Sequence, residues 1–202
     1  MTQPPARRRL DPSLRRAQIL DVALEMFENK TFSTVSLRHI AAACDVNIAL
    51  IYHYFESKDD LVRAALRHSV DSFVTYFAAQ PPKADQPLGR ASDWLDATIS
   101  SIPPLLRMVK LMADYAAAGA VDEQAADAIA DFYRRERETF EQSILQGLAE
   151  GRFRPVDVAR TARLASMTLD GIFFSGVARS DLDYAGNIAD LHAQLIDFLL
   201  IS

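Results

Sequence analysis

The sequence has little of what several common protein classes need. Its 202 residues include one cysteine, Cys44, which excludes an intramolecular disulfide and a Cys/His zinc framework. No apolar run has the length of a membrane span. Residues 10–12, Leu-Asp-Pro, follow the Arg7–Arg9 run at the point where a signal peptide would continue with apolar residues. We therefore expect an unprocessed, soluble, cytoplasmic chain with no membrane partner.

Motifs of catalysis are also missing. The chain contains no G-x-G-x-x-G, G-x-x-x-x-G-K, H-E-x-x-H or G-x-S-x-G segment, and its four histidines are scattered along the sequence. Dinucleotide, phosphate, zinc and serine-nucleophile chemistry each require one of these spacings. We therefore expect no catalytic residue, no metal and no cofactor, and the sequence does not favour an enzyme.

Charge is distributed unevenly along the chain. The net charge of −5 argues against a nucleic-acid partner when it is taken alone, because phosphate binding normally leaves a basic footprint. Residues 1–63, however, hold nine Lys and Arg against eight Asp and Glu, and five arginines lie within residues 1–16. A basic arm on an acidic body is compatible with DNA binding. The Arg7–Arg9 run is either a solvated tail or an arm that follows the DNA.

Apolar residues recur at three- and four-residue steps almost throughout, while glycine is scarce and β-type alternation is nearly absent. This pattern predicts an all-α protein of about nine helices. A loop with three prolines, residues 81–87, separates four helices from five, since prolines at this density cannot continue a helix. The expected helices span residues 12–29, 37–44, 47–54, 58–79, 88–101, 103–117, 121–149, 156–178 and 185–201.

Residues 34–61 carry the most information about function. Two short helices joined by a tight turn form the unit in which the second helix lies in the major groove while the first supports it. The small side chains of Ala41 and Ala42 allow the two helices to approach each other. The exposed face of the second helix is expected to present Asn47, Ile48, Leu50, Tyr52 and His53, whereas Tyr54 and Phe55 are expected in the core.

This segment resembles the amino-terminal signature of the tetracycline-repressor (TetR) family. The resemblance covers about residues 14–62. It rests on residues 16, 19, 20, 23 and 27 in the first helix, and then on Ile40-Ala41, Val46-Asn47, residues 51–55, Ser57-Lys58 and Leu61. It implies a helix-turn-helix DNA-binding domain over residues 1–62 and a helical ligand-binding and dimerisation domain over residues 63–202.

The resemblance also implies a function. A member of this family is a sequence-specific transcriptional regulator, commonly a repressor, that binds a palindromic double-stranded DNA operator as a homodimer. A small-molecule effector releases it, and we expect this effector to be apolar or aromatic. From the residues alone, a helical protein-interaction module that does not bind DNA remains the alternative.

DNA contacts are carried over by position in the family pattern. Ile48, Ala49 and Leu50 stand where the family often has polar or glycine residues, and contact with thymine methyl groups is one role for them. Lys58 begins the next helix, whose amino terminus favours a phosphate. Asn47 is expected either to cap its helix or to bind DNA. The predicted DNA-binding residues are Ser36, Arg38, Asn47, Ile48, Ala49, Leu50, Tyr52, His53 and Lys58.

Two further sites are expected in the carboxy-terminal part, although aromatic and methionine residues at helical spacing are also ordinary core residues. The helix over 58–79 joins both domains, and we expect effector binding to shift it. The predicted cavity residues are Trp94, Met108, Met112, Tyr115, Phe140, Met167, Asp170 and Phe174. The predicted dimer-interface residues are Ala165, Leu169, Ile172, Phe173, Leu191, Leu195 and Phe198.

Overall fold

The computed structural model describes residues 11–83, 85–119, 123–179 and 181–201, and in these ranges the regular elements are helices. The all-α prediction is therefore confirmed. Phe153 and Leu200 add one isolated antiparallel bridge. The helices are α1 (Pro12–Asn29), α2 (Leu37–Ala43), α3 (Ile48–Tyr54), α4 (Lys58–Ala79), α5 (Arg90–Ser100), α6 (Ile102–Ala117), α7 (Glu123–Ala149), α8 (Val158–Ala178) and α9 (Tyr184–Leu199).

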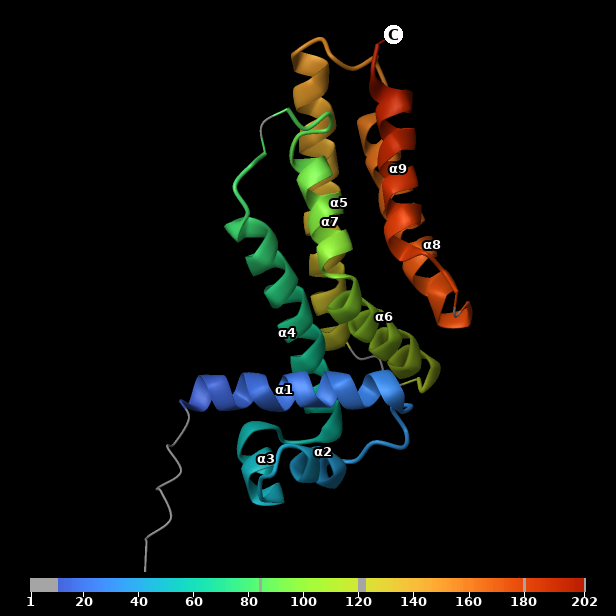
Figure 1. Ribbon diagram of the computed structural model, residues 1–202. Helices are drawn as coiled ribbons and strands as arrows, with labels where there is room; N and C mark the ends of the chain where they lie inside the picture. The colour runs from blue at the N-terminus through green and yellow to red at the C-terminus, as the bar shows by residue number, and fades with distance from the viewer. Residues whose placement is uncertain (1–10, 84, 120–122, 180, 202) are drawn as a thin grey trace, which may run out of the picture.

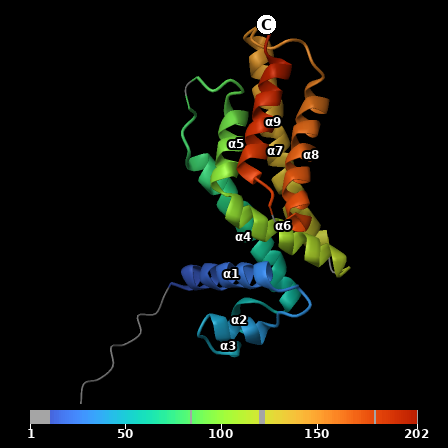
Figure 2. The same cartoon turned by 45° about the vertical axis from the view of Figure 1, so that its right-hand side comes forward.

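The helices form a small head and a larger body (Figure 1). In the head, α1 lies across α2 and α3, and α4 rises from this unit toward the bundle that α5, α7, α8 and α9 build. Helix α6 crosses near the base of the bundle and packs against α1, as a second view also shows (Figure 2). Helix α4 runs without a break through residues 62 and 63, where the sequence places the domain boundary. None of the helices in the described ranges is long and apolar enough to span a membrane.

Side-chain caps define where the helices of the head begin. Asp11 accepts a hydrogen bond from the Ser13 amide at 2.9 Å, and Pro12 occupies the first turn of α1. Ser57 Oγ accepts from the Asp60 amide at 3.0 Å, while the Asp60 carboxylate accepts from the Glu56 amide at 3.0 Å. The predicted pair of a serine and an acid three residues later therefore caps α4. In the usual capping box the acid accepts from the amide of the serine itself, whereas Asp60 accepts from the amide of the preceding residue, Glu56.

One apolar core holds the head together. Helices α1 to α4 all contribute side chains that are almost completely removed from solvent. Burial of each large apolar side chain contributes about 1.5–3 kcal/mol to folding. The main members are Ile19, Leu20, Phe27, Ile40, Ile51, Phe55 and Leu61. Because this core uses the inner face of α3, the opposite face of that helix is left on the surface.

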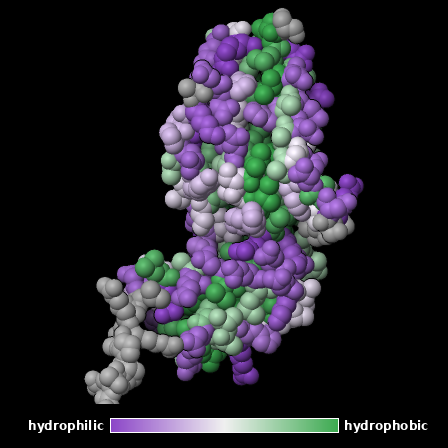
Figure 3. Space-filling model, in the orientation of Figure 1, coloured by the Kyte–Doolittle hydropathy of each residue, from purple (hydrophilic) through white to green (hydrophobic). Residues whose placement is uncertain are grey.

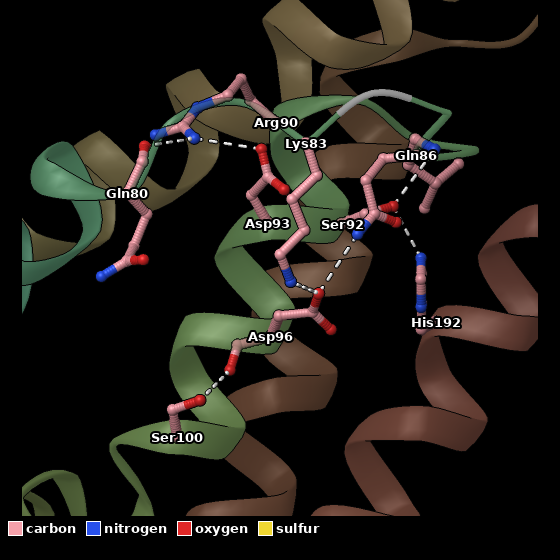
Figure 4. A network of polar contacts seen from close by, with 10 residues as sticks. Gln80, Lys83, Gln86, Arg90, Ser92, Asp93, Asp96, Ser100 and His192 are labelled. Atoms are coloured by element: carbon pink, nitrogen blue, oxygen red, sulfur yellow. Dashed lines mark hydrogen bonds and ion pairs between the residues drawn. The ribbon is translucent and has the colours of Figure 1, made fainter.

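Polar contacts fasten the proline-rich loop to the body (Figure 4). Lys83 Nζ lies 2.6 Å from Asp96 Oδ2, and Arg90 pairs with Asp93 at 3.0 Å while also donating to the Gln80 carbonyl at 3.3 Å. The buried Ser92 hydroxyl lies 2.7 Å from His192 Nε2 and joins α5 to α9. These contacts give the predicted loop a defined path, which the high proline content alone does not specify.

Candidate nucleic-acid interface

Helix α3 presents one face to the core and one to solvent. Ile51 and, just after the helix, Phe55 are buried, whereas Tyr52 is 58% exposed and His53 is also exposed. The predicted positions Asn47 and Ala49 are exposed as well, and Ile48 and Leu50 are half-buried. Phe55 is in the core as expected, and Tyr54 is half-buried against it. The outer face of α3 is therefore a compact polar and aromatic surface that a DNA groove can accommodate.

Asn47 sits at the amino end of α3 and has a structural role. Its side-chain Oδ1 accepts a hydrogen bond from the Ala49 amide at 2.9 Å. The sequence left capping and DNA binding open for this residue, and the structure shows the cap. The side-chain amide nitrogen is a separate donor, so the cap does not remove the capacity of Asn47 to donate a hydrogen bond.

Helix α2 begins with a reciprocal cap that the sequence analysis did not identify. Ser36 Oγ accepts from the His39 amide at 3.3 Å, and His39 Nδ1 accepts from the Ser36 amide at 3.2 Å. The imidazole therefore takes the place that glutamate or glutamine has in the usual capping box. Arg38, in the same first turn, is exposed beside this cap. The sequence signal for this cap was a serine followed, three residues later, by a side chain that can accept a hydrogen bond.

Lys58 is half-buried rather than extended toward solvent. Its ammonium donates to the Phe32 carbonyl and lies 4.0 Å from the centre of the Phe32 ring. Burial lowers the pKa of this ammonium, while the nearby Asp59 opposes the shift. Lys58 therefore ties the loop between α1 and α2 to the start of α4, a role that sequence reasoning missed. The predicted contact of Lys58 with a phosphate remains a prediction.

Contacts between distant parts of the chain join the head to the body. Arg107 of α6 pairs with Glu28 of α1 at 2.7 Å, and Lys110 of α6 donates to the Glu28 carbonyl. On the other side, His68 of α4 lies 2.9 Å from Asp21 of α1. Each pair is separated by at least 47 residues in sequence, so periodicity and local motifs carry no signal for it. Helix α1 is therefore bound by side chains of both α6 and α4.

A small internal cavity lies among α5, α6, α7 and α8. Its volume is about 20 Å³, which is enough for about one water molecule. Of the eight residues predicted for the cavity, Met108 and Asp170 line it. Trp94 touches its edge by donating to Glu136. The lining residues are Thr98, Leu105, Met108, Val109, Phe132, Tyr133, Glu136, Leu169, Asp170 and Phe173.

The other predicted cavity residues lie elsewhere. Tyr115 and Phe140 are buried in the core, and Met112 is half-buried against it. Met167 is 62% exposed and Phe174 is 40% exposed, and neither lines this cavity. Both stand on the outer face of α8. That helix carries apolar residues on two faces, and hydrophobic periodicity does not tell which face is turned inward.

Most of the predicted dimer-interface residues are turned toward the inside of this chain. All but Phe198 pack inside this chain and offer almost no surface to a partner. The buried ones are Ala165, Leu169, Ile172, Phe173, Leu191 and Leu195. The exposed apolar stripe consists instead of Leu164, Met167 and Phe174 on α8 together with Phe198 on α9, and we call it the outer stripe. Apolar side chains also form a band on the surface of the bundle in the view that contains α9 (Figure 3).

Glu136 is an acidic cavity residue that the sequence analysis missed. It is only 4% exposed, and its carboxylate accepts hydrogen bonds from Trp94 Nε1 at 3.3 Å and from the Ser166 hydroxyl. Burial raises its pKa to about 7, an effect that the nearby Asp170 increases and the two hydrogen bonds oppose. Glu136 is four residues from both Phe132 and Phe140 and so shares the apolar face of α7. This spacing was the sequence signal that the acid is buried.

Asp170 and Tyr133 form a second polar pair at the cavity. The Tyr133 hydroxyl donates a hydrogen bond to the Asp170 carboxylate. Burial raises the pKa of both groups, and the hydrogen bond opposes this shift for Asp170. The cavity therefore combines apolar walls with two carboxyl groups.

The Arg7–Arg9 run, for which the sequence leaves a solvated tail or a DNA-following arm open, lies outside the described residues.

A helix-turn-helix with an outward second helix, carried by a helical body, defines a DNA-binding regulator of transcription. Comparison with protein families agrees: residues 19–65 match the family described as bacterial regulatory proteins, tetR family. Residues 87–199 match the family described as BetI-type transcriptional repressor, C-terminal. The chain belongs to the tetR family and carries a carboxy-terminal region of the BetI type, so the resemblance noted from the sequence is confirmed.

Individual relatives support the same assignment. The HTH-type transcriptional repressor KstR2 of Mycolicibacterium smegmatis is 25% identical over 144 residues, which cover 71% of this chain and 70% of that protein. A TetR transcription regulator from Haloarcula marismortui has the same fold, with a TM-score of 0.80 and 20% identity over 94% of this chain and 100% of that one. A regulator from Saccharomonospora viridis, solved in complex with choline, has a TM-score of 0.76 and 19% identity, covering 94% of this chain and 100% of its own. The named relatives are regulators of transcription rather than enzymes.

Proposed function

We propose that this protein is a cytoplasmic, homodimeric repressor that binds a palindromic operator through α3 and is released by a small-molecule effector. The outward face of α3 carries the proposal, because Tyr52 and His53 are exposed on a helix whose other face is anchored in the core of the head. In a helix-turn-helix such a helix enters the major groove. The functional boundary between DNA-binding head and effector-binding body then falls within α4, near residue 62.

The exposed residues of α2 and α3 have chemistry that suits DNA. The Arg38 guanidinium and the Tyr52 hydroxyl are donors for phosphate oxygens or base edges, and the Asn47 amide nitrogen remains a donor beside its cap. Ala49 and His53 complete the exposed set. The other predicted contacts, Ser36, Ile48, Leu50 and Lys58, are half-buried and would act at the margin of this surface.

Dimerisation through the outer stripe would place two heads on one operator. A palindrome needs two recognition helices that are roughly 34–36 Å apart, or a multiple of that distance. The outer stripe offers apolar contact area, and Gly171 lies on the same face of α8 with nothing within 4 Å of the site where a Cβ would stand. Two bundles can therefore approach closely at this point.

An experiment on oligomeric state tests the stripe. Met167→Glu places a charge at its centre, and we expect the variant to sediment as a monomer. Leu145→Glu is the matched control, because Leu145 is similarly exposed but lies on α7. A dimeric Met167→Glu protein, or equal dissociation of both variants, would show that the interface lies elsewhere.

Effector release would act through the contacts between head and body. A ligand shifts an equilibrium only when it binds one conformation better than the other. An effector that moved α6 relative to α4 would act on α1, because α6 binds Glu28 and α4 binds Asp21 of that helix. The regulator from Saccharomonospora viridis was solved with choline bound, which supports a small-molecule effector as the class of ligand.

Selection of bound duplexes from a random pool tests DNA binding. We expect one palindromic sequence to be enriched, with a stoichiometry of two chains per duplex, and its affinity to fall steeply as salt rises. A protein that enriches no sequence at moderate ionic strength is not the proposed repressor. In that case the helical protein-interaction module would be the better description.

A further inference from the structure

A cleft of about 360 Å³ opens between the head and the body, outside the helical bundle. Residues of α1, α4 and the turn from α5 to α6 form its wall. Apart from Leu105, it shares no lining residue with the small internal cavity among α5, α6, α7 and α8. Small-molecule sites in proteins have volumes of about 300–1,000 Å³. The cleft is therefore large enough for one small molecule, whereas the internal cavity is not.

Two serines of α4 that line the cleft have hydroxyl groups available to a ligand. On other helices of this chain, the hydroxyls of Thr98, Ser100 and Thr139 donate to the carbonyl four residues back. Ser69 and Ser72 form no such bond, and they form no other hydrogen bond within the described residues. Both hydroxyls can therefore donate to a ligand and accept from it.

Ser101 supplies a third hydroxyl of this kind, for a reason that lies in the sequence. It directly precedes α6, where a serine normally accepts a hydrogen bond from the amide of the second or third helical residue. In α6 these residues are Pro103 and Pro104, which have no amide hydrogen. The Ser101 side chain therefore makes no capping bond, and Ser101 lines the cleft instead.

Part of the cleft wall is apolar. Leu24 of α1, Phe73 of α4 and Leu105 of α6 line it and are almost fully buried. Serines together with an apolar wall suit a ligand that carries hydroxyl groups as well as carbon–hydrogen surface. A sugar ring has this composition, since its hydroxyl groups bond to polar side chains while its carbon–hydrogen face packs against aliphatic or aromatic side chains.

The charged and titratable side chains that line the cleft already have partners. Asp21 lies 2.9 Å from His68. Arg107 pairs with Glu28 at 2.7 Å and with Glu25 at 3.7 Å. A charged ligand would have to compete with these pairs, whereas a neutral ligand would not. The second oxygen of the Asp21 carboxylate can still accept a hydrogen bond from a hydroxyl group. The cleft therefore favours a neutral ligand over an ion.

We infer that this cleft is a second small-molecule site, which binds a neutral sugar of hexose size through the hydroxyl groups of Ser69, Ser72 and Ser101. The bound sugar contacts α1 of the head together with α4 and the start of α6. It therefore acts at the joint between head and body and not in the interior of the bundle. The inference goes beyond the proposed function, because sugar binding does not require DNA.

Isothermal titration calorimetry of the purified protein tests the class of ligand. The probes are D-glucose, D-galactose and D-mannose, and the control is tetrahydropyran-2-methanol, which has the hexose ring but a single hydroxyl group. We expect at least one hexose to bind with a Kd of about 1 mM or lower, and the control to bind at least about tenfold more weakly because it loses several hydrogen bonds. No binding of any hexose, or equal binding of the control, would overturn the inference.

Charged analogues test whether the ligand is neutral. The uronic acid and the 2-amino analogue of the hexose that binds best are titrated in the same way at neutral pH. We expect neither analogue to bind more tightly than the parent sugar, because the charged side chains of the cleft are already paired. Tighter binding of either analogue would contradict the proposed class of ligand.

Serine variants locate the bound sugar. Ser72→Ala and Ser101→Ala each remove one hydroxyl group, and we expect each to weaken sugar binding by about three- to tenfold. Alanine favours a helix more than serine does, so Ser72→Ala should fold like the wild type. Thr75→Ala is the matched control, because it removes an exposed hydroxyl from α4 at a position that does not line the cleft. Unchanged affinity in both serine variants, or equal weakening by Thr75→Ala, would place the sugar elsewhere.

The selection of duplexes separates a failure of this inference from a failure of the proposed function. If the protein binds a hexose in the cleft but selects no duplex, the proposed function fails and the inference stands. If it selects a palindromic duplex but binds none of the hexoses, only the inference fails.

Discussion

The polar side chains that cap the helices of the head stand at its surface, whereas the body, which also has caps at Asp157 and Asp183, encloses an acid in its interior as well. In the head, Asp11, Ser36, Asn47 and Ser57 stand at helix ends and satisfy open backbone amides. In the body, the carboxylate of Glu136 is buried inside the bundle, where it accepts hydrogen bonds from Trp94 and Ser166. The first arrangement stabilises a preformed surface, while the second costs stability unless a ligand compensates it. The comparison suggests that the head is built to keep its shape and the body to respond.

The largest expected effect tests the rigidity of the head. Phe55→Ala removes a fully buried ring from its core and should lower the free energy of unfolding by about 3–5 kcal/mol. Because the outer face of α3 depends on that core, operator binding should be lost as well. Urea denaturation followed by circular dichroism measures the first effect. A loss of less than about 1 kcal/mol would mean that the head is loosely packed.

The next effect tests the cost of the buried acid in the body. The pKa of Glu136 in the folded protein is about 7, above its ordinary value of 4.5, because of burial. Between these values the unfolded chain releases its proton while the folded one keeps it, so stability falls as pH rises through this window and stays reduced above it. Glu136→Gln should therefore be more stable than the wild type at pH 8, by on the order of 3 kcal/mol.

Thermal denaturation over a range of pH measures this difference. The advantage of Glu136→Gln should shrink steadily as the pH is lowered and vanish near the ordinary pKa of 4.5. Glu138→Gln, at an exposed position, should show no such advantage at any pH. A constant difference between the wild type and Glu136→Gln across the range would show that burial of the charge is not its cause.

A smaller effect separates DNA binding from stability. Tyr52→Ala removes an exposed side chain from α3 and should weaken operator binding by about 1–3 kcal/mol without changing the unfolding midpoint. Tyr76→Ala is the matched control, since Tyr76 is an exposed tyrosine on α4, remote from α3. Fluorescence anisotropy with the selected duplex measures both affinities. Equal losses of operator affinity in the two variants would show that α3 is not the DNA-binding helix.

The smallest effect concerns a single cap. Asn47→Ala deletes the hydrogen bond to the Ala49 amide and should destabilise the head by about 1 kcal/mol. Asn47→Ser keeps a capping oxygen and should restore most of that stability. If the serine variant recovers stability but not operator affinity, the side-chain amide of Asn47 contacts DNA as well as capping α3. Recovery of both would assign Asn47 to the cap alone.

Much of the fold followed from local patterns. The nine helices of the described residues have the predicted order, and their bounds differ from the predicted ones by about two residues or fewer, because periodicity and caps depend on neighbouring residues. The outward position of Tyr52 and His53 was predictable for the same reason, since a seven-residue helix with Ile51 on one side has few alternatives. The resemblance to the tetR family needed only the spacing of residues in this head.

What the sequence by itself determined is therefore the set of helices and the surface of α3. Only the tertiary structure decided which face of α8 is inside, so that Leu169 and Phe173 are buried while Met167 and Phe174 are exposed. It also brought Glu136 beside Trp94 and joined Arg107 to Glu28. The physical reason is that a helix with two apolar faces, or a pair of charges many turns apart, acquires its partner only when the bundle assembles.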